Sequence, residues 1–429
     1  MPHPTAPAAT HYTRTVLAGM IGNVLEWYDF ALFGFMAPIL SPLFFPTEDR
    51  LAALLSTYGI FAIGFLMRPI GGIFFGHIGD RLGRKKALER SVLLMALPTT
   101  ALGLLPTYAQ VGLAAPVLLT LIRMLQGLSV GGEFIGSISF LGEHAPARRR
   151  GFFGSWSGTS AALGNLLGSG AAALVESFVP TADLATWGWR VPFFCSVLMG
   201  IVGLWLRRDC TESPQFSQAK AEGEVARLPL VVALRQDRPA IVITAGLTLM
   251  LSVGFYLPWV WLPTWMSILP HPLPLSKALT INTLAMGLLL ALQPVFGALS
   301  DKLGRRPVII AGCTALAVLI YPLFRLLSHG SELAYLQGTL VIALFAAMAA
   351  GAAPAAYVEL FPTRTRYSGI ALGYNCTQAI LGGTTPFIAT WLIGATGDIL
   401  APAFYFLAAA VVCGVAAFCM TERAGRELA

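Results

Sequence analysis

Apolar runs recur along the 429-residue chain and are separated by short polar loops. A helix needs about 20 predominantly apolar residues to cross the hydrocarbon core of a bilayer. The pattern therefore predicts an all-α integral membrane protein, and an even number of spans places both termini on one side. The twelve expected transmembrane helices are residues 16–40, 51–75, 88–106, 112–137, 152–177, 190–207, 240–268, 277–298, 307–327, 334–357, 370–395 and 400–420.

Charged residues are few, and their positions are more informative than their number. Hydrophobic residues make up 56% of the chain and charged residues 11%, whereas soluble domains contain about 25% charged residues. Of the 28 Lys and Arg residues, 22 lie in the termini and in the loops that follow even-numbered spans. The positive-inside rule then predicts cytoplasmic termini in a plasma (inner) membrane protein. Because the basic residues follow this topology, the net charge of +7 does not indicate a nucleic acid partner.

The start of the chain predicts a first span that is retained. Residues 1–15 are rich in Pro and Ala, and the apolar segment after them contains Glu26 and Asp29 but no small-residue cleavage site. The sequence has no G-x-x-x-x-G-K-S/T loop for ATP, and its six cysteines have no spacing typical of a metal site or a disulfide framework. We expect no cofactor, no metal and an energy source other than ATP.

Short sequences recur in the two halves of the chain. Residues 76–86 (GHIGDRLGRKK) match residues 297–306 (GALSDKLGRR) at an offset of 221, and residues 143–150 match residues 359–366 at an offset of 216. This duplication predicts a transporter built from two six-helix bundles. The expected parts are a short cytoplasmic N-terminus at 1–15, a first bundle at 16–207, a cytoplasmic linker at 208–239, a second bundle at 240–420 and a short cytoplasmic C-terminus at 421–429.

The repeated loops place acidic and basic side chains at helix ends on one side of the membrane. Such charges can pair across the two bundles in one conformation and separate in another. The alternative is that the basic residues only set the topology, and the matched Gly and Asp positions favour conformational gating. The candidate gating residues are Gly76, Asp80, Arg81, Gly83, Arg84, Asp301, Gly304, Arg305, Glu143, Arg148, Glu359 and Arg364.

Five further motifs are residues 22–30 (GNVLEWYDF), 65–72 (FLMRPIGG), 126–133 (QGLSVGGE), 187–194 (WGWRVPFF) and 211–216 (TESPQF). Together with the repeated loops, they resemble the metabolite:proton symporter family of the major facilitator superfamily over essentially the whole chain. The resemblance implies two bundles around a midplane cavity that opens alternately to each side. It also implies proton symport of a solute such as proline, betaine, 2-oxoglutarate or citrate. Osmotic sensing by the long C-terminal coiled coil of some betaine transporters is not expected.

Three carboxylates are expected at membrane depth, where an ionisable group is costly and is usually functional. Glu26 and Asp29 lie three residues apart and share a helix face in the first span, and Glu133 lies in the fourth. Loss of water favours the protonated form of a carboxyl, so alternating access can drive proton uptake and release. Glu26, Asp29 and Glu133 are therefore the proton-coupling candidates. The alternative is a permanent ion pair, for example between Asp29 and Arg123.

Candidate substrate contacts combine guanidinium groups, aromatic rings and amides. Arg68 or Arg123 can offer a planar fork to a carboxylate. Residues 255–265 (FYLPWVWLPTW) carry prolines that bend or break the seventh span and rings that can attract an alkylated ammonium. These rings can instead form an interfacial belt. The substrate-binding candidates are Arg123, Arg68, Asn23, Tyr28, Trp156, Tyr256, Trp259, Trp261, Tyr374 and Asn375.

These features favour a secondary importer that couples protons to uptake of a small carboxylate-bearing solute. A proton-coupled exporter and a transport-derived sensor are the alternatives, and an enzyme is the least favoured class because no nucleophile and base pair or metal spacing is found. Import of a zwitterion such as betaine or proline is slightly favoured over a di- or tricarboxylate, because one central arginine suits one carboxylate. The expected partners are the solute, protons and the lipid bilayer, and the oligomeric state is left open.

Overall fold

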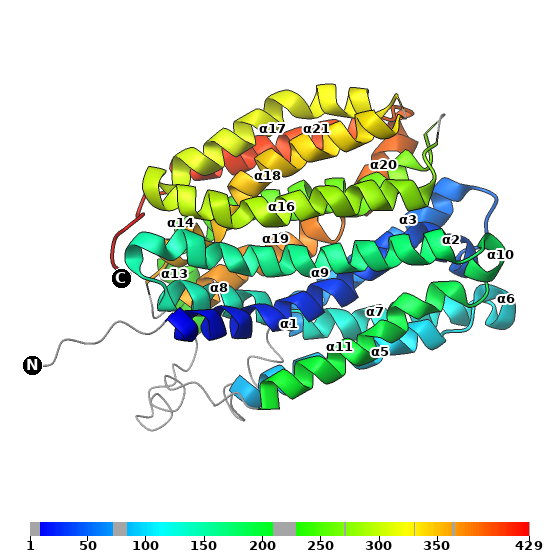
Figure 1. Ribbon diagram of the computed structural model, residues 1–429, viewed down its shortest axis with the longest axis horizontal. Helices are drawn as coiled ribbons and strands as arrows, with labels where there is room; N and C mark the ends of the chain where they lie inside the picture. Colours follow the sequence, from blue (N-terminus) through cyan, green and yellow to red (C-terminus); the bar gives the residue numbers. More distant parts are fainter. Residues whose placement is uncertain are drawn as a thin grey trace, which may run out of the picture.

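The computed structural model describes residues 9–71, 84–208, 229–269, 272–329, 331–362 and 365–428, and these residues are almost entirely helical. Long helices run up and down along one axis, and α1 begins at the same end of the bundle as α21 finishes (Figure 1). We call this end the terminal end and the other the opposite end. Residues 9–208 are called the N-terminal half, and residues 229–428 the C-terminal half.

The described helices divide between the two halves as follows. The N-terminal half contains α1 (Ala9–Phe35), α2 (Ala37–Phe44), α3 (Arg50–Leu66), α5 (Arg84–Leu104), α6 (Tyr108–Val111), α7 (Ala114–Ser129), α8 (Glu133–His144), η1 (Ala147–Arg149), α9 (Arg150–Phe178), α10 (Thr181–Leu184), η2 (Gly188–Arg190) and α11 (Val191–Arg208). The C-terminal half contains α13 (Pro229–Gln236), α14 (Arg238–Tyr256), η3 (Leu257–Trp261), α15 (Leu262–Met266), α16 (Leu275–Leu303), α17 (Arg305–Leu327), α18 (Glu332–Leu360), α19 (Arg366–Thr377), η4 (Gln378–Gly382), α20 (Thr385–Thr396) and α21 (Ala401–Cys419).

The helices agree with the predicted twelve spans in number and order. Within the described residues, eight helices are long and apolar enough to cross a membrane, and α1 with α2 forms a ninth, bent span. Shorter apolar helices at Leu93–Leu104 and Gly188–Val202 occupy the third and sixth predicted spans. The fifth is α9, whose buried face is rich in Gly and Ser. Gly and Ser lower the mean hydropathy of α9. They are tolerated there because much of the helix packs against protein.

Several spans depart from a regular α-helix, and of these the sequence predicts a bend or break in the seventh. The first bends by 59° between α1 and α2, where Pro38 opens α2, and the fourth breaks between α7 and α8. The seventh and eleventh each contain a single π-helical turn, η3 and η4. The predicted break at Pro258 is therefore a π-helical turn within a continuous span, and such turns are frequent at functional sites.

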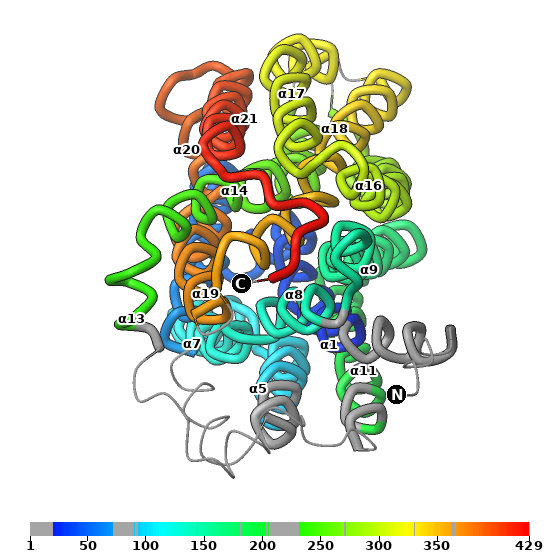
Figure 2. The backbone as a smooth tube through the Cα atoms, turned by 90° about the vertical axis from the view of Figure 1, so that its left-hand side faces the viewer, coloured from blue at the N-terminus to red at the C-terminus, as the bar shows by residue number. Residues whose placement is uncertain are grey.

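The two halves meet along α9, which lies beside α16 in both views (Figures 1 and 2). Glycines allow this approach: a Cβ on Gly151 would lie 2.3 Å from the Gly297 carbonyl oxygen, and one on Gly297 would lie 2.6 Å from the Gly151 oxygen. Small residues let membrane helices pack backbone to backbone. The glycines of the fifth span thus build the interface between the halves.

Candidate functional site

Aromatic rings from both halves meet at the centre of the bundle. Trp27 of α1 stacks on Tyr256 of α14 with ring centroids 6.2 Å apart, and Phe65 of α3 meets the same tyrosine edge-on at 5.1 Å. Phe134 of α8 lies 5.8 Å from Trp27 and 4.9 Å from Tyr374 of α19. We call these five buried residues the ring cluster. Offset and edge-on contacts of this kind stabilise the interface beyond the area that they bury.

Arg68 lies against the ring cluster and is only 1% exposed. Its guanidinium carbon is 5.6 Å from the ring centroid of Trp27 and 5.3 Å from that of Phe65. The Nη2 atom lies 3.9 Å from Glu26 Oε1 and donates to the Val130 carbonyl at 3.5 Å. In the part of the chain that the structure describes, Nε has no hydrogen-bond partner. Arg68 therefore has rings around it but only long polar contacts.

The break in the fourth span lies beside these groups. The carbonyls of residues 130–132 accept, in chain order, from Arg68 (3.5 Å), Asn375 (2.9 Å) and Tyr367 (3.1 Å). Backbone groups that leave a helix at membrane depth need such partners. Asn375, a predicted substrate contact, therefore holds the broken helix across the interface. Glu133 opens α8 directly after the break, and its side chain is partly buried.

A second polar group, inside the N-terminal half, surrounds Asp29 of α1. The Ser196 hydroxyl donates to this carboxylate, and Thr99, whose hydroxyl donates to the Met95 carbonyl at 2.9 Å, lies beside it. Gln126 donates from Nε2 to Thr99 Oγ1 at 2.6 Å, and Arg123 donates from Nη1 to Gln126 Oε1 at 2.7 Å. We call these five buried residues the polar chain. Thr99 and Gln126 thus lie between Asp29 and Arg123.

The other face of Arg123 lies on phenyl rings. Its guanidinium carbon is 4.3 Å from the ring centroid of Phe30, 4.6 Å from that of Phe33 and 5.5 Å from that of Phe61. The Phe61 ring in turn lies 5.9 Å from that of Tyr256 in the ring cluster. The polar chain and the ring cluster are therefore linked by packed aromatic side chains.

Two predicted substrate contacts on α1 connect helices of the N-terminal half. Asn23 donates to the Ser160 hydroxyl of α9 at 3.2 Å, and the Tyr28 hydroxyl donates to the Pro192 carbonyl at 2.9 Å. Trp156 lies one turn before Ser160 in α9, nearer to the terminal end, and is partly buried.

The predicted tryptophans of the seventh span pack within the C-terminal half. Trp261 donates from Nε1 to the Thr390 hydroxyl at 2.9 Å, and its ring centroid lies 6.2 Å from that of Trp265. Asn282 donates to the Trp259 carbonyl at 2.9 Å. The last contact satisfies a carbonyl of the π-helical turn η3. Of the predicted aromatic residues, Tyr256 and Tyr374 are the ones that the structure brings into the ring cluster.

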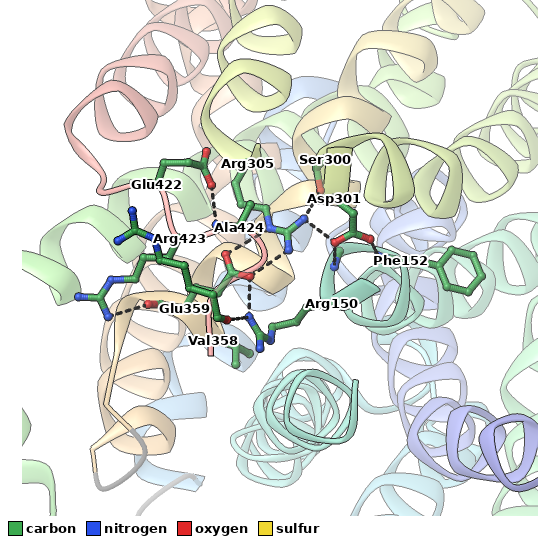
Figure 3. A network of polar contacts seen from close by, with 12 residues as sticks. Arg150, Phe152, Ser300, Asp301, Arg305, Val358, Glu359, Glu422, Arg423 and Ala424 are labelled. Atoms are coloured by element: carbon green, nitrogen blue, oxygen red, sulfur yellow. Dashed lines mark hydrogen bonds and ion pairs between the residues drawn. The ribbon is translucent and has the colours of Figure 1, made fainter. Parts of the chain in front are cut away.

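A charged network closes the terminal end (Figure 3). Glu359 accepts from Arg150 at 3.0 Å and from Arg305 at 2.9 and 3.2 Å, so it contacts both halves. Asp301 accepts from Arg305 at 2.8 Å and from the backbone N–H groups of residues 151–152 at 2.7 and 2.9 Å. An acidic group at a helix N-terminus is favoured by the unpaired amides and the helix dipole. Asp301 therefore caps α9 from the other half.

A second ion pair crosses the interface with the arginine and the acid on exchanged halves. Arg366 of the C-terminal half donates to Glu143 of the N-terminal half at 2.9 Å. Glu143 and Glu359 are 216 positions apart, as are Arg150 and Arg366. The two crossing pairs, Arg150 with Glu359 and Arg366 with Glu143, are thus equivalent in the duplication. The candidate set contained both acids but neither arginine, although the repeated E-x₆-R spacing could have indicated them.

Segments next to this network strengthen it. Glu422, after α21, accepts from the Arg306 amide at 2.8 Å and so caps α17, and the Arg426 carbonyl accepts from Arg150 at 3.2 Å. Gly304 joins α16 to α17 with φ +99°, a conformation that favours glycine. Among the other candidates, Arg148 is exposed and Arg84 opens α5. Gly76, Asp80, Arg81, Gly83 and Arg364 lie outside the described residues.

Hydrogen bonds also join the halves at the opposite end. The Tyr58 hydroxyl donates to Thr264 at 2.9 Å. The hydroxyls of Ser169 and Thr283 lie 2.9 Å apart and are hydrogen-bonded. The two halves are therefore in contact at both ends and at the ring cluster between them.

The chain matches a known sequence family over most of its length. The model of the family described as Sugar (and other) transporter covers residues 15–237 and 271–429. The proline/betaine transporter of Salmonella typhimurium is 36% identical over 425 residues, which cover 97% of this chain and 84% of that relative. The glycine betaine/proline/ectoine/pipecolic acid transporter OusA of Dickeya dadantii is 33% identical over 424 residues, with the same coverage of 97% and 84%.

Solved structures match the fold. The proton:xylose symporter XylE, bound to 6-bromo-6-deoxy-D-glucose, superposes with a TM-score of 0.79 at 18% identity and covers 98% of both chains. A D-xylose-proton symporter superposes with a TM-score of 0.76 at 20% identity and covers 97% of this chain and all of that one. At this level of identity the likeness concerns the fold.

Proposed function

Because the chain belongs to the Sugar (and other) transporter family within the major facilitator superfamily, we propose that this membrane transporter couples protons to solute uptake. The solute is a small carboxylate-bearing molecule of the betaine or proline kind, since transporters named for these solutes are 33–36% identical to this chain. Proton coupling is supported by a buried carboxylate that is linked to a buried arginine inside the N-terminal half.

The polar chain is the observation that carries the coupling role. Asp29 accepts a hydrogen bond from Ser196 and lies beside Thr99. Thr99 accepts from Gln126, which presents its carbonyl to Arg123. Protonation of Asp29 neutralises the carboxylate at the other end of the polar chain from Arg123. The position of Arg123 on the phenyl rings then depends on the protonation of Asp29. Charge and packing are thereby linked, which is what a proton-coupled conformational change requires.

Alternating access follows from the contacts between the halves. The ion pairs at the terminal end and the hydrogen bonds at the opposite end cannot both persist if the halves rock about the ring cluster. We expect one set to break while the other holds, as in rigid-body rocking of two repeats around a midplane site. Glu359, Arg150, Arg366 and Glu143 are the proposed gate at the terminal end.

The proposed orientation places the terminal end and both termini in the cytoplasm, in an inner membrane. Support comes from the 22 of 28 Lys and Arg residues in the termini and in the loops after even-numbered spans. The bacterial relatives are transporters as well. In this orientation the gate between Glu359 and Arg150 faces the cytoplasm.

A di- or tricarboxylate is the second candidate solute. One observation favours it, because two buried arginines, Arg68 and Arg123, lie on either side of packed aromatic residues. Two guanidinium groups can hold two carboxylates. Against this, Arg123 already donates to Gln126 at 2.7 Å.

Proteoliposomes containing the purified protein test the proposed function. We expect an imposed inward proton gradient to drive accumulation of glycine betaine or proline, and dissipation of the gradient by a protonophore to abolish accumulation. Citrate and 2-oxoglutarate are the comparison solutes. Accumulation of either of these alone would favour the second candidate, and solute uptake that ignores the proton gradient would refute proton coupling.

A further inference from the structure

Arg68 and Glu26 place two opposite charges beside the ring cluster, where the Arg68 guanidinium lies against the Trp27 and Phe65 rings. Arg68 and Glu26 lie 3.9 Å apart, and their side chains are 1% and 5% exposed. We propose that the ring cluster, Arg68 and Glu26 form the binding site for a zwitterion with a fully alkylated ammonium group. In this site the solute carboxylate binds Arg68, and its ammonium group lies among the rings beside Glu26. The inference rests on the proposed uptake function and defines the solute that it concerns.

Arg68 suits a carboxylate because its own contacts are long. A guanidinium has five N–H donors. Within the described residues, the Arg68 guanidinium lies 3.5 Å from the Val130 carbonyl and 3.9 Å from Glu26, and its Nε has no partner. Charge-assisted bonds to a carboxylate measure about 2.7–2.9 Å and are often bidentate. A solute carboxylate can therefore improve on the contacts that Arg68 has here.

The rings suit an alkylated ammonium because it has no N–H to donate. Such a cation is recognised by the negative faces of aromatic rings, and tryptophan is the strongest. Trp27 is adjacent to Glu26 in the sequence and stacks on Tyr256, whose hydroxyl has no hydrogen-bond partner among the described residues. Phe65 and Phe134 add rings from two other helices. A cation held there is close to the Glu26 carboxylate as well.

The charge balance of the site selects for a neutral solute. Arg68 and Glu26 carry opposite charges, so a zwitterion adds no net charge to this buried pair. A dicarboxylate would bring a second negative charge toward Glu26, and an unpaired buried charge is strongly disfavoured. Arg123 packs instead on Phe30 and Phe33 and donates to Gln126 at 2.7 Å, and Arg68 is the arginine that lies against Trp27 of the ring cluster.

The same site connects binding to closure. Trp27, Phe65 and Phe134 belong to the N-terminal half, and Tyr256 and Tyr374 belong to the C-terminal half. A cation enclosed by both sets of rings is bound most tightly when the halves are together. Binding then favours the closed arrangement by the difference in affinity between the two states.

Equilibrium binding with three probes of similar shape tests the site. Glycine betaine has both charges, 3,3-dimethylbutyrate replaces its quaternary nitrogen by carbon, and choline keeps the nitrogen but lacks the carboxylate. With purified full-length protein and isothermal titration calorimetry, we expect glycine betaine to bind at least about tenfold more tightly than either single-charge probe, since each desolvated charge contact contributes that much or more.

Substitutions should change the selectivity in opposite directions. Glu26→Gln is expected to reduce the preference for glycine betaine over 3,3-dimethylbutyrate by about tenfold, and Arg68→Gln the preference over choline by a similar factor. Trp27→Leu is expected to weaken glycine betaine and choline by about tenfold and 3,3-dimethylbutyrate much less. Glu332→Gln and Arg325→Gln are the matched controls, because both side chains lie on the exposed surface.

The outcomes are distinct. If Glu26→Gln and Arg68→Gln leave the ratios between the probes unchanged, the two residues have a structural role and the proposal fails. Where Arg68→Gln does not fold, Arg68→Lys and Tyr256→Leu replace it: the first keeps the charge without the fork, the second removes a ring, and selectivity equal to wild type in both overturns the site. Binding is measured without a gradient. If the variants change selectivity but the protein shows no proton-driven uptake, the site stands and the proposed function is refuted. If proton-driven uptake occurs but the variants leave selectivity unchanged, the site alone is refuted.

Discussion

The polar chain around Asp29 and the ion pairs at the terminal end differ in which helices they connect. The polar chain joins α1, α5, α7 and α11, all in the N-terminal half. The pairs of Arg150 with Glu359 and of Arg366 with Glu143 join one half to the other. If the halves move as rigid bodies, contacts within one half persist while contacts between halves must break. The polar chain can therefore keep its protonation state while the halves move, whereas the ion pairs between the halves form in one conformation and break in the other.

The largest effect is expected from the centre of the polar chain. Asp29→Asn removes the charge without changing the side-chain size, so proton-driven accumulation in proteoliposomes should fall to the level without a gradient. Exchange of internal for external solute does not require net proton movement and should continue. The measurement is accumulation against counterflow in the same vesicles. Normal accumulation by Asp29→Asn would remove this carboxylate from the coupling role.

The next largest effect is expected at the gate. Glu359→Gln leaves Arg150 and Arg305 without their shared carboxylate, and removing one partner of a buried pair costs about 3–5 kcal/mol. Because this loss applies only when the terminal end is closed, the variant should open there. Spin labels at Arg149→Cys and Leu303→Cys in a cysteine-free background measure the opening as a longer inter-label distance.

Glu143→Gln is the matched comparison at the gate. The Glu143 side chain is 29% exposed, whereas that of Glu359 is 4% exposed. Water can replace part of the lost contact, so we expect a smaller shift in the distance distribution between the same labels. Equal shifts in the two variants would show that burial does not set the strength of the gate.

An intermediate effect is expected from the links of the polar chain. Gln126→Leu deprives Arg123 of its acceptor and Thr99 of its donor, and an unsatisfied buried group costs about 1–3 kcal/mol. We expect solute uptake to become less dependent on the proton gradient while solute binding is retained. Thr99→Val should have a similar effect, and Thr99→Ser, which keeps the hydroxyl, should resemble the unmodified protein. A loss of function in Thr99→Ser equal to that in Thr99→Val would point to packing instead.

The smallest effect is expected at the opposite end. Tyr58→Phe removes the hydrogen bond to Thr264, which contributes about 0.5–1.5 kcal/mol. The variant should open slightly at that end, the reverse of Glu359→Gln. Labels at Glu48→Cys and Asp398→Cys report this distance, and Tyr321→Phe on the exposed surface is the control. Opening at the terminal end in Tyr58→Phe would contradict the gate assignment.

Part of the site could be predicted from the sequence because charge is unusual at membrane depth. Glu26, Asp29, Arg68 and Arg123 stand out in an apolar chain, and the structure places all four in the two buried polar groups described above. Trp27 and other members of the ring cluster give no such signal. In a membrane protein an aromatic residue is ordinary, and only the opposing helix distinguishes a site from packing.

The partners of the charged residues could not be predicted, because they too depend on which helices pack against one another. Asp29 and Arg123 were candidates for a direct pair, but Thr99 and Gln126, from two helices, stand between them. Likewise, Trp261 is directed to Thr390 within the C-terminal half, whereas Tyr256, one turn earlier, faces the other half. The π-helical turn between them changes the helix face, and hydropathy does not report it.

The sequence by itself determined the membrane class, the number of spans, the duplication and the family, because each depends on local hydropathy or on motifs that repeat along the chain. Tertiary structure alone decided which acid meets which arginine, where spans break or form π-helical turns, and which rings come together. These features depend on helix rotation and on contacts between residues far apart in the chain. Small shifts in helix position decide whether aromatic residues form a binding site or only pack. Glycines such as Gly151 and Gly297 set such positions because they let facing helices approach closely.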